Sequence, residues 1–95
     1  MNNETRLRRM ELQGLSANSL SHDRLLAETK QVLNNVIRKD FTAAEARLMC
    51  AGASIYLDES ARLSYITFFD EELSKIEKPI DQWKKAAEWL MNNIK

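Results

Sequence analysis

The clearest helical pattern in the chain lies in its last 17 residues, PIDQWKKAAEWLMNNIK, numbered 79–95. Apolar residues recur there at spacings of three and four, which predicts a helix with one apolar stripe. Pro79, the only proline in the sequence, suits the first turn of such a helix. The stripe consists of Ile80, Trp83, Ala87, Leu90 and Ile94.

The second tryptophan of this segment, Trp89, lies off the apolar stripe. At about 100° per residue, its side chain points roughly 130° away from the centre of the stripe, on the same outer side as Lys85. Because tryptophan is enriched at binding hot spots, one interpretation places Trp89 in an interface with a partner, with Phe68 as a weaker candidate. The alternative is that the helix lies between two neighbours and that both tryptophans are core residues.

The size and composition of the chain indicate one small helical domain. Its 95 residues are 44% apolar and 29% charged, which is ordinary for a globular domain. Two glycines and one proline favour helices over sheets, so we expect an all-α fold. A chain of this size buries only about 60–65% of its unfolded surface, and association with a partner or a second copy would add stability.

The first clear amphipathic pattern predicts a helix over residues 22–38, with Ser21 as its N-cap. Residues 14–21, GLSANSLS, resemble a linker of small residues. We therefore expect an irregular or short-helical N-terminal arm and linker over residues 1–20, and a helical bundle domain over residues 21–95. The apolar face of the helix contains Leu25, Leu26, Thr29, Val32, Leu33, Val36 and Ile37.

Thr42 and Glu45 have the spacing of a capping box, which predicts that a second helix begins there. Residues 43–57 are apolar on nearly every side, and such a helix is expected to be surrounded. Its alanines and Gly52 would let neighbouring helices approach closely. We therefore expect this helix to be central, and a second protomer to cover it if too few other helices do. This pattern raises the hypothesis of a homodimer.

A break at residues 58–60, with Asp58 or Ser60 as N-cap, predicts a third helix that ends near Glu77. The run YITFF, residues 65–69, also has high β-propensity, but a single strand would have nothing to pair with. The prediction is therefore a compact bundle of four main helices. The stripe of the third helix consists of Ala61, Tyr65, Phe69, Leu73 and Ile76.

The formal net charge is zero, but the charge is unevenly distributed. Residues 41–77 carry a net charge of −4, whereas residues 1–40 and 78–95 each carry +2. Asp70 and Glu71 are consecutive, and consecutive helical side chains point about 100° apart, so they do not converge on one ligand. We interpret them as part of a solvated face; the alternative is an acidic patch that receives a basic partner.

Residues that carry catalysis or bind metals are scarce. His22 is the only histidine and Cys50 the only cysteine, and the sequence contains no HExxH, CxxC, P-loop or GxGxxG motif. Cys50 lies among apolar residues, where a thiol is usually inert, so a Cys50–His22 dyad is a weak alternative. We expect no enzymatic activity, no cofactor, no metal and no small-molecule substrate.

Arg6, Arg8 and Arg9 form a basic cluster near the N-terminus. An arm of this kind can contact nucleic acid, although the zero net charge argues against a strongly electrostatic binder. A small nucleic-acid-binding regulator is therefore the second hypothesis. No apolar run of about 18 residues would span a membrane, and the N-terminus lacks the apolar core of a secretory signal, so we expect a cytoplasmic protein.

The favoured prediction is a non-enzymatic protein–protein interaction module: an adaptor, an inhibitor or an immunity-type regulator. It would act through an apolar and aromatic helix surface on another protein, and the homodimer hypothesis adds a second copy. In size and helical pattern the chain resembles small bacterial or phage proteins such as four-helix bacteriocin immunity proteins and secretion chaperones. That resemblance is of architecture only and assigns no residues. The predicted partner-binding residues are Trp89, Lys85, Phe68, Asp70 and Glu71.

Overall fold

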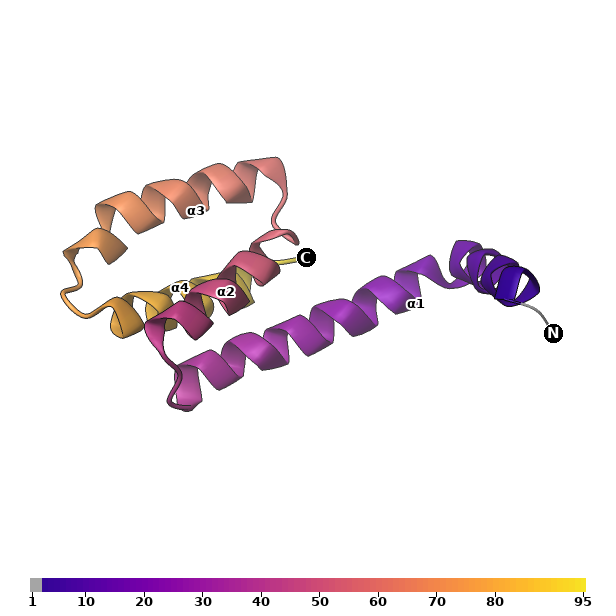
Figure 1. Ribbon diagram of the computed structural model, residues 1–95. Coiled ribbons are helices and arrows are strands. Elements are labelled where there is room, and N and C mark those ends of the chain that lie inside the picture. Colours follow the sequence, from indigo (N-terminus) through magenta and orange to yellow (C-terminus); the bar gives the residue numbers. More distant parts are fainter. Residues whose placement is uncertain (1–2) are drawn as a thin grey trace.

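The part of the chain that the structure describes folds into four α-helices and one short 3₁₀-helix, with no strand (Figure 1). This computed structural model describes the backbone of residues 3–95 and the side chains of residues 21–95. The prediction of an all-α bundle of four main helices is confirmed. In chain order the elements are α1 (Asn3–Arg38), α2 (Ala43–Ser54), α3 (Glu59–Glu71), η1 (Leu73–Lys75) and α4 (Pro79–Asn93).

The central element is α4, which contacts α1, α2, α3 and η1. In Figure 1, α2 and α4 lie between α1 and α3. The expectation that the second helix would be central was wrong. The physical reason is that α4 carries apolar residues on more than one side, so it can face α1 and α2 as well as α3.

The core lies where α1, α2 and α4 meet. The predicted stripe of α4 is confirmed, because Ala87, Leu90 and Ile94 are buried while Ile80 and Trp83 are half-buried. Alanine is prominent in this core, which allows the helix backbones to approach closely. The buried cluster comprises Leu33, Val36, Ala46, Cys50, Ala53, Leu57, Leu73, Ala86, Ala87, Leu90 and Ile94.

Helix α1 begins at Asn3, earlier than the predicted start near His22. The backbone of residues 3–20 is therefore helical, and Ser21 lies inside the helix instead of capping it. Glycine and serine lower helix propensity by no more than about 1 kcal/mol each, and no proline interrupts the segment. The division of the chain into residues 1–20 and 21–95 stays a prediction.

The capping box at the start of α2 is confirmed. The Glu45 backbone N–H donates to Thr42 Oγ1 at 3.1 Å, and the Thr42 backbone N–H donates to Glu45 Oε1 at 3.0 Å. The Thr42 backbone N–H and the Thr42 hydroxyl, which donates to Glu45 Oε1 at 2.9 Å, hold the pKa of the Glu45 carboxyl below its ordinary value. The helix ends at Ser54, three residues before the predicted end.

The expectation that α2 is surrounded was wrong. Ala46, Cys50 and Ala53 are buried, but Leu48 is 73% exposed on the opposite side. Because α2 packs mainly against α1 and α4, the side that carries Leu48 faces solvent. In the homodimer hypothesis, this exposed side of α2 is the surface that the second protomer would cover.

The predicted N-cap Asp58 directly precedes α3, and its Oδ1 accepts a hydrogen bond from the Ala61 backbone N–H at 2.7 Å. It ends at Glu71, and the stripe continues into η1, where Leu73 is buried. The α3–α4 connection is held by Gln82 Nε2, which donates to the Ile76 carbonyl at 2.8 Å. Because α3 itself buries no residue completely, half-buried side chains must attach it to the bundle.

Candidate functional site

A layer of aromatic side chains joins α3 to α4. The Trp89 ring stacks on Tyr65 with centroids 5.4 Å apart and on Phe68 with centroids 5.9 Å apart. Trp83 packs against Phe69 with centroids 5.1 Å apart. Both tryptophans therefore contact α3, and the one that lies off the α4 stripe has an intramolecular neighbour. This arrangement matches the alternative in which the helix is placed between neighbours, while Trp89 stays half-exposed.

Three of the predicted partner-binding residues lie together. Phe68, Lys85 and Trp89 line one groove between α3 and α4, together with Glu88 and Asn92. We call this set of five residues the aromatic groove. Its rim carries an exposed ion pair in which Lys85 Nζ lies 4.0 Å from Glu88 Oε2. An indole beside one basic and one acidic side chain can contact a mixed apolar and charged protein surface.

The two predicted acidic residues are not part of the aromatic groove. Asp70 lines a separate groove with Tyr65, Ile66, Phe69 and Trp83. Glu71 is exposed at the end of α3. The five predicted partner-binding residues therefore do not form one surface. Phe68, Lys85 and Trp89 line the aromatic groove, whereas the two acidic residues lie elsewhere on α3.

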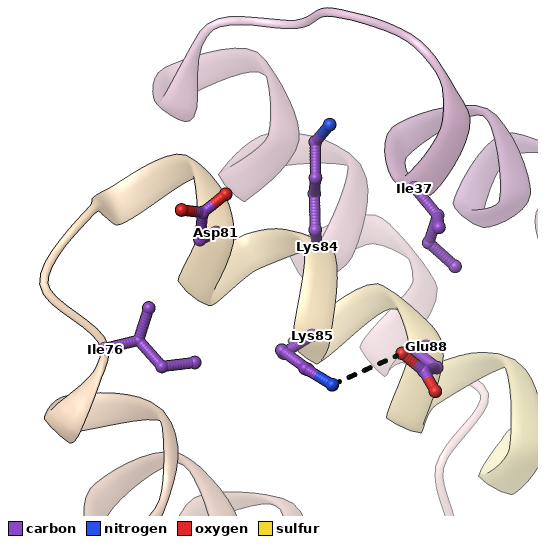
Figure 2. Close-up of a pocket in the computed structure, with 6 residues that line it drawn as sticks. All are labelled: Ile37, Ile76, Asp81, Lys84, Lys85 and Glu88. Atoms are coloured by element: carbon purple, nitrogen blue, oxygen red, sulfur yellow. Dashed lines mark ion pairs between the residues drawn. The ribbon is translucent and has the colours of Figure 1, made fainter.

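A larger hollow of about 390 Å³ lies along α4, between the end of α1 and the α3–α4 connection. Figure 2 shows Lys85 paired with Glu88, whereas the Lys84 ammonium points away from this pair. Asp81 lies at the other end of the hollow, and Ile37 and Ile76 complete its lining. Two cations and two carboxylates balance each other, and they do not converge on one point as a catalytic or phosphate-binding site would require.

Helices α1 and α2 leave several large apolar side chains exposed along one groove. Leu48 of α2 and Ile55, the residue that follows α2, are 73% and 69% exposed, and Leu25 and Val32 of α1 are 51% and 41% exposed. A groove with no charged side chain in its lining runs between the two helices. We define the apolar face as Leu25, Thr29, Val32, Leu48, Met49, Gly52, Ile55 and Tyr56.

The sequence analysis did not assign these residues to a site. It placed Leu25 and Val32 on the core face of α1 and treated the whole of α2 as enclosed. The signal was nevertheless present, because a helix that is apolar on all sides needs more neighbours than a four-helix chain supplies. The homodimer hypothesis drew on that signal.

Gly52 lies in the last turn of α2, where glycine costs up to about 1 kcal/mol of helix stability relative to alanine. A Cβ added there would meet nothing within 4 Å, and the residue does not adopt a positive φ. Neither a close neighbour nor a special backbone conformation within the described chain requires glycine at this position. Its bare backbone leaves a depression between Leu48 and Ile55.

The weak alternative of a Cys50–His22 dyad is not supported by the geometry, which instead matches the expected inert thiol. Cys50 is completely buried, and burial raises the pKa of its thiol to about 12, so it is protonated at neutral pH. Its Sγ donates to the Trp83 carbonyl at 3.7 Å. His22 is exposed on α1, with its ring 5.8 Å from that of Tyr56.

Residues 21–95 contain no group of three or more histidine, cysteine or carboxylate side chains that could hold a metal ion. None of the helices described there has the length and apolarity needed to cross a bilayer. The side chains of Arg6, Arg8 and Arg9 lie outside the described ones. No protein-family model, curated protein or solved structure matches the chain.

Proposed function

We propose that this protein is a non-enzymatic protein-interaction module that binds through the apolar face. The observation that carries the proposal is the exposure of Leu48 and Ile55, which flank Gly52 on the open side of α2. Single exposed apolar residues are common on protein surfaces, but a contiguous patch that spans two helices is typical of an interaction site.

A partner that covers the apolar face removes its side chains from water. Complete burial of one leucine or isoleucine side chain gains about 1.5–3 kcal/mol relative to full exposure. The exposed fractions of Leu48 and Ile55 leave most of that free energy available to a partner. Because the groove lining is uncharged, covering it removes no charged group from water and leaves little desolvation cost to offset the gain.

A helix-containing protein surface fits this face best. Helices α1 and α2 form two adjacent ridges with a groove between them. Such a groove can accept the apolar side of another helix, whose side chains recur at spacings of three and four. The finer roles that we propose are those of an adaptor, an inhibitor or an immunity-type regulator in the cytoplasm. The aromatic groove, with Trp89 and Lys85, would supply a second contact surface for a partner.

The test is an affinity capture of the tagged full-length chain from a lysate of its source, with and without nuclease. We expect a stoichiometric protein partner that survives nuclease and is lost with Leu48→Glu. The matched control is Leu63→Glu, because Leu63 is 63% exposed on α3, away from the apolar face. Retention of the partner by the Leu48→Glu variant would contradict the proposal. Partners that vanish with nuclease would instead favour a nucleic-acid role for Arg6, Arg8 and Arg9.

A further inference from the structure

We infer that the partner covering the apolar face is a second copy of this chain, packed with its α2 antiparallel to α2 of the first. The inference rests on the proposed function and names the occupant of the same surface. It follows from the order of large and small residues along the open side of α2. Leu48, Ala51 and Gly52 of α2, and the C-cap residue Ile55 that continues its line, are all exposed on that side.

The order of these residues is self-complementary. In a two-fold interface, residue i of one copy contacts residue j of the other, and j contacts i. An axis between residues 51 and 52 places Leu48 of one copy opposite Ile55 of the other, and Ala51 opposite Gly52. Large side chains then meet near the ends of the contact and small ones at its centre, where the two backbones can approach closely.

The exposed apolar residues of α1 are arranged about the same two-fold axis as those of α2. A centre between residues 28 and 29 places Leu25 of one copy opposite Val32 of the other, and these are the two exposed large apolar residues in the part of α1 whose side chains the structure describes. Thr29 and Gly52 line one groove, so the centres on α1 and α2 lie at a common level of the face. One two-fold axis therefore pairs Leu25 with Val32 and Leu48 with Ile55, the four exposed large apolar side chains of the apolar face.

The composition of the face also favours a copy of itself. Its groove lining contains no charged residue, so an identical surface is an uncharged match for it. Glu28, which the centre on α1 places opposite Thr29 of the other copy, is paired within its own chain, with Arg24 Nε 3.3 Å from Glu28 Oε1. By contrast, the grooves on the α3 and α4 sides contain Asp70, or Lys85 and Glu88. A charged partner would fit those grooves better than it fits the apolar face.

The size of the face sets the strength of the association. Twelve residues make α2 about 18 Å long, and two adjacent helices are about 20 Å wide, which gives a footprint of about 400 Å². A standard stable interface buries about 800 Å² on each partner. We therefore expect a reversible dimer with a dissociation constant in the micromolar range, measured by sedimentation equilibrium on the full chain.

The first test is disulfide trapping with Ala51→Cys, at the centre of the proposed contact, where the side chain already carries a Cβ. A disulfide requires two Cα atoms within about 7 Å, which the proposed axis brings about at this position. The single native cysteine, Cys50, is buried and does not compete. The control is Ser64→Cys on the exposed outer side of α3. We expect the Ala51→Cys variant to cross-link roughly tenfold faster than the control, because pairing raises the local thiol concentration; equal rates would overturn the inference.

The second test examines the register. Leu48→Glu and Ile55→Lys should each abolish the dimer, because each places a charge opposite an apolar side chain of the other copy. The double variant should restore it, because two Glu–Lys pairs then form across the axis. Within one chain the two positions are about 10 Å apart along the helix, too far to pair. Failure of the double variant to dimerise would overturn the antiparallel register.

The two proposals fail in different ways. If the wild-type chain stays monomeric at concentrations up to about 1 mM, well above a micromolar dissociation constant, the second-copy inference is wrong. If lysate capture nevertheless depends on Leu48, the proposed function stands with a different occupant. If neither dimerisation nor capture depends on Leu48, both are wrong.

Discussion

Trp89 stacks on Tyr65 across the α3–α4 interface, with ring planes inclined by only 25°. The same indole is inclined by 19° to the ring of Phe68, one turn further along α3. Because α3 has no completely buried residue, these half-buried rings carry most of its attachment to the bundle. An aromatic layer of this kind spaces two helices further apart than the alanines between α2 and α4 do.

Replacing Trp89 by alanine should destabilise the fold. The variant loses two ring contacts, each worth about 0.5–1.5 kcal/mol beyond area burial, and we expect a loss of about 2–3 kcal/mol in the free energy of unfolding. Urea unfolding followed by circular dichroism measures it. Lys85→Ala, at the rim of the same groove, should change the free energy by less than about 0.5 kcal/mol. An unaffected Trp89→Ala variant would show that α3 is held in another way.

Stability should fall at alkaline pH. Burial raises the pKa of Cys50 from 9.0 to about 12. Burial, together with the nearby Cys50 thiolate, raises the pKa of Tyr65 from 10.0 to about 12. Both groups are therefore protonated more strongly in the folded state than in the unfolded state. The resulting stabilisation is complete below pH about 9 and is lost as the pH rises towards 12.

The measurement for this prediction is the urea midpoint of the wild type as a function of pH, from about 8 to about 11. Cys50→Ala should remove the thiol part of the decline and Tyr65→Phe the phenol part. A wild-type midpoint that does not change over this range would contradict the burial of both groups.

The pattern of the sequence predicts the helices well, because their signals are local. Thr42 accepts a hydrogen bond from the first turn of α2, and Asp58 accepts one from the first turn of α3. Pro79 is the first residue of α4, so each of these three boundaries is determined by residues within one helical turn of it. The start of α1 was missed for the opposite reason. Small residues such as Gly14 weaken a helix without ending it, and no local signal shows whether a weak segment stays helical.

Gly52→Ala should separate monomer stability from association. The added methyl group meets no atom within 4 Å and improves helix propensity, so we expect the monomer to gain up to about 1 kcal/mol in the free energy of unfolding. The same methyl group fills the depression between Leu48 and Ile55 and should weaken binding at the apolar face. Thermal unfolding at low concentration and capture efficiency measure the two effects. A variant that is less stable and binds normally would contradict this account of Gly52.

Thr42→Ala should cost about 1 kcal/mol of stability, because it removes the acceptor of the Glu45 backbone N–H at the start of α2. The variant should also weaken the stability that the Glu45 carboxylate confers. That contribution is present above the ordinary carboxyl pKa of 4.5 and is lost as the pH falls through the lowered pKa in the folded state. Unfolding curves at pH about 3 and about 7 test both statements, and Thr42→Ser is the control that keeps the hydroxyl.

The candidate surfaces were less predictable than the helices. The position of Trp89 off the α4 stripe correctly indicated a second contact, but the sequence could not show that the contact lies within the chain, on Tyr65. The apolarity of α2 was visible, but which side stays open depends on where α1 and α4 pack. Leu48 and Cys50 look equally apolar in the sequence, yet one is exposed and the other is buried.

The most direct test of the apolar face as the binding surface is hydroxyl-radical footprinting of the chain, free and in its captured complex. Leucine and isoleucine side chains oxidise when they are exposed, so Leu48 and Ile55 should react in the dilute free protein. We predict that complex formation protects both residues and leaves Leu63 on α3 as reactive as before. Unchanged oxidation of Leu48 and Ile55 in the complex, with protection elsewhere, would contradict the account.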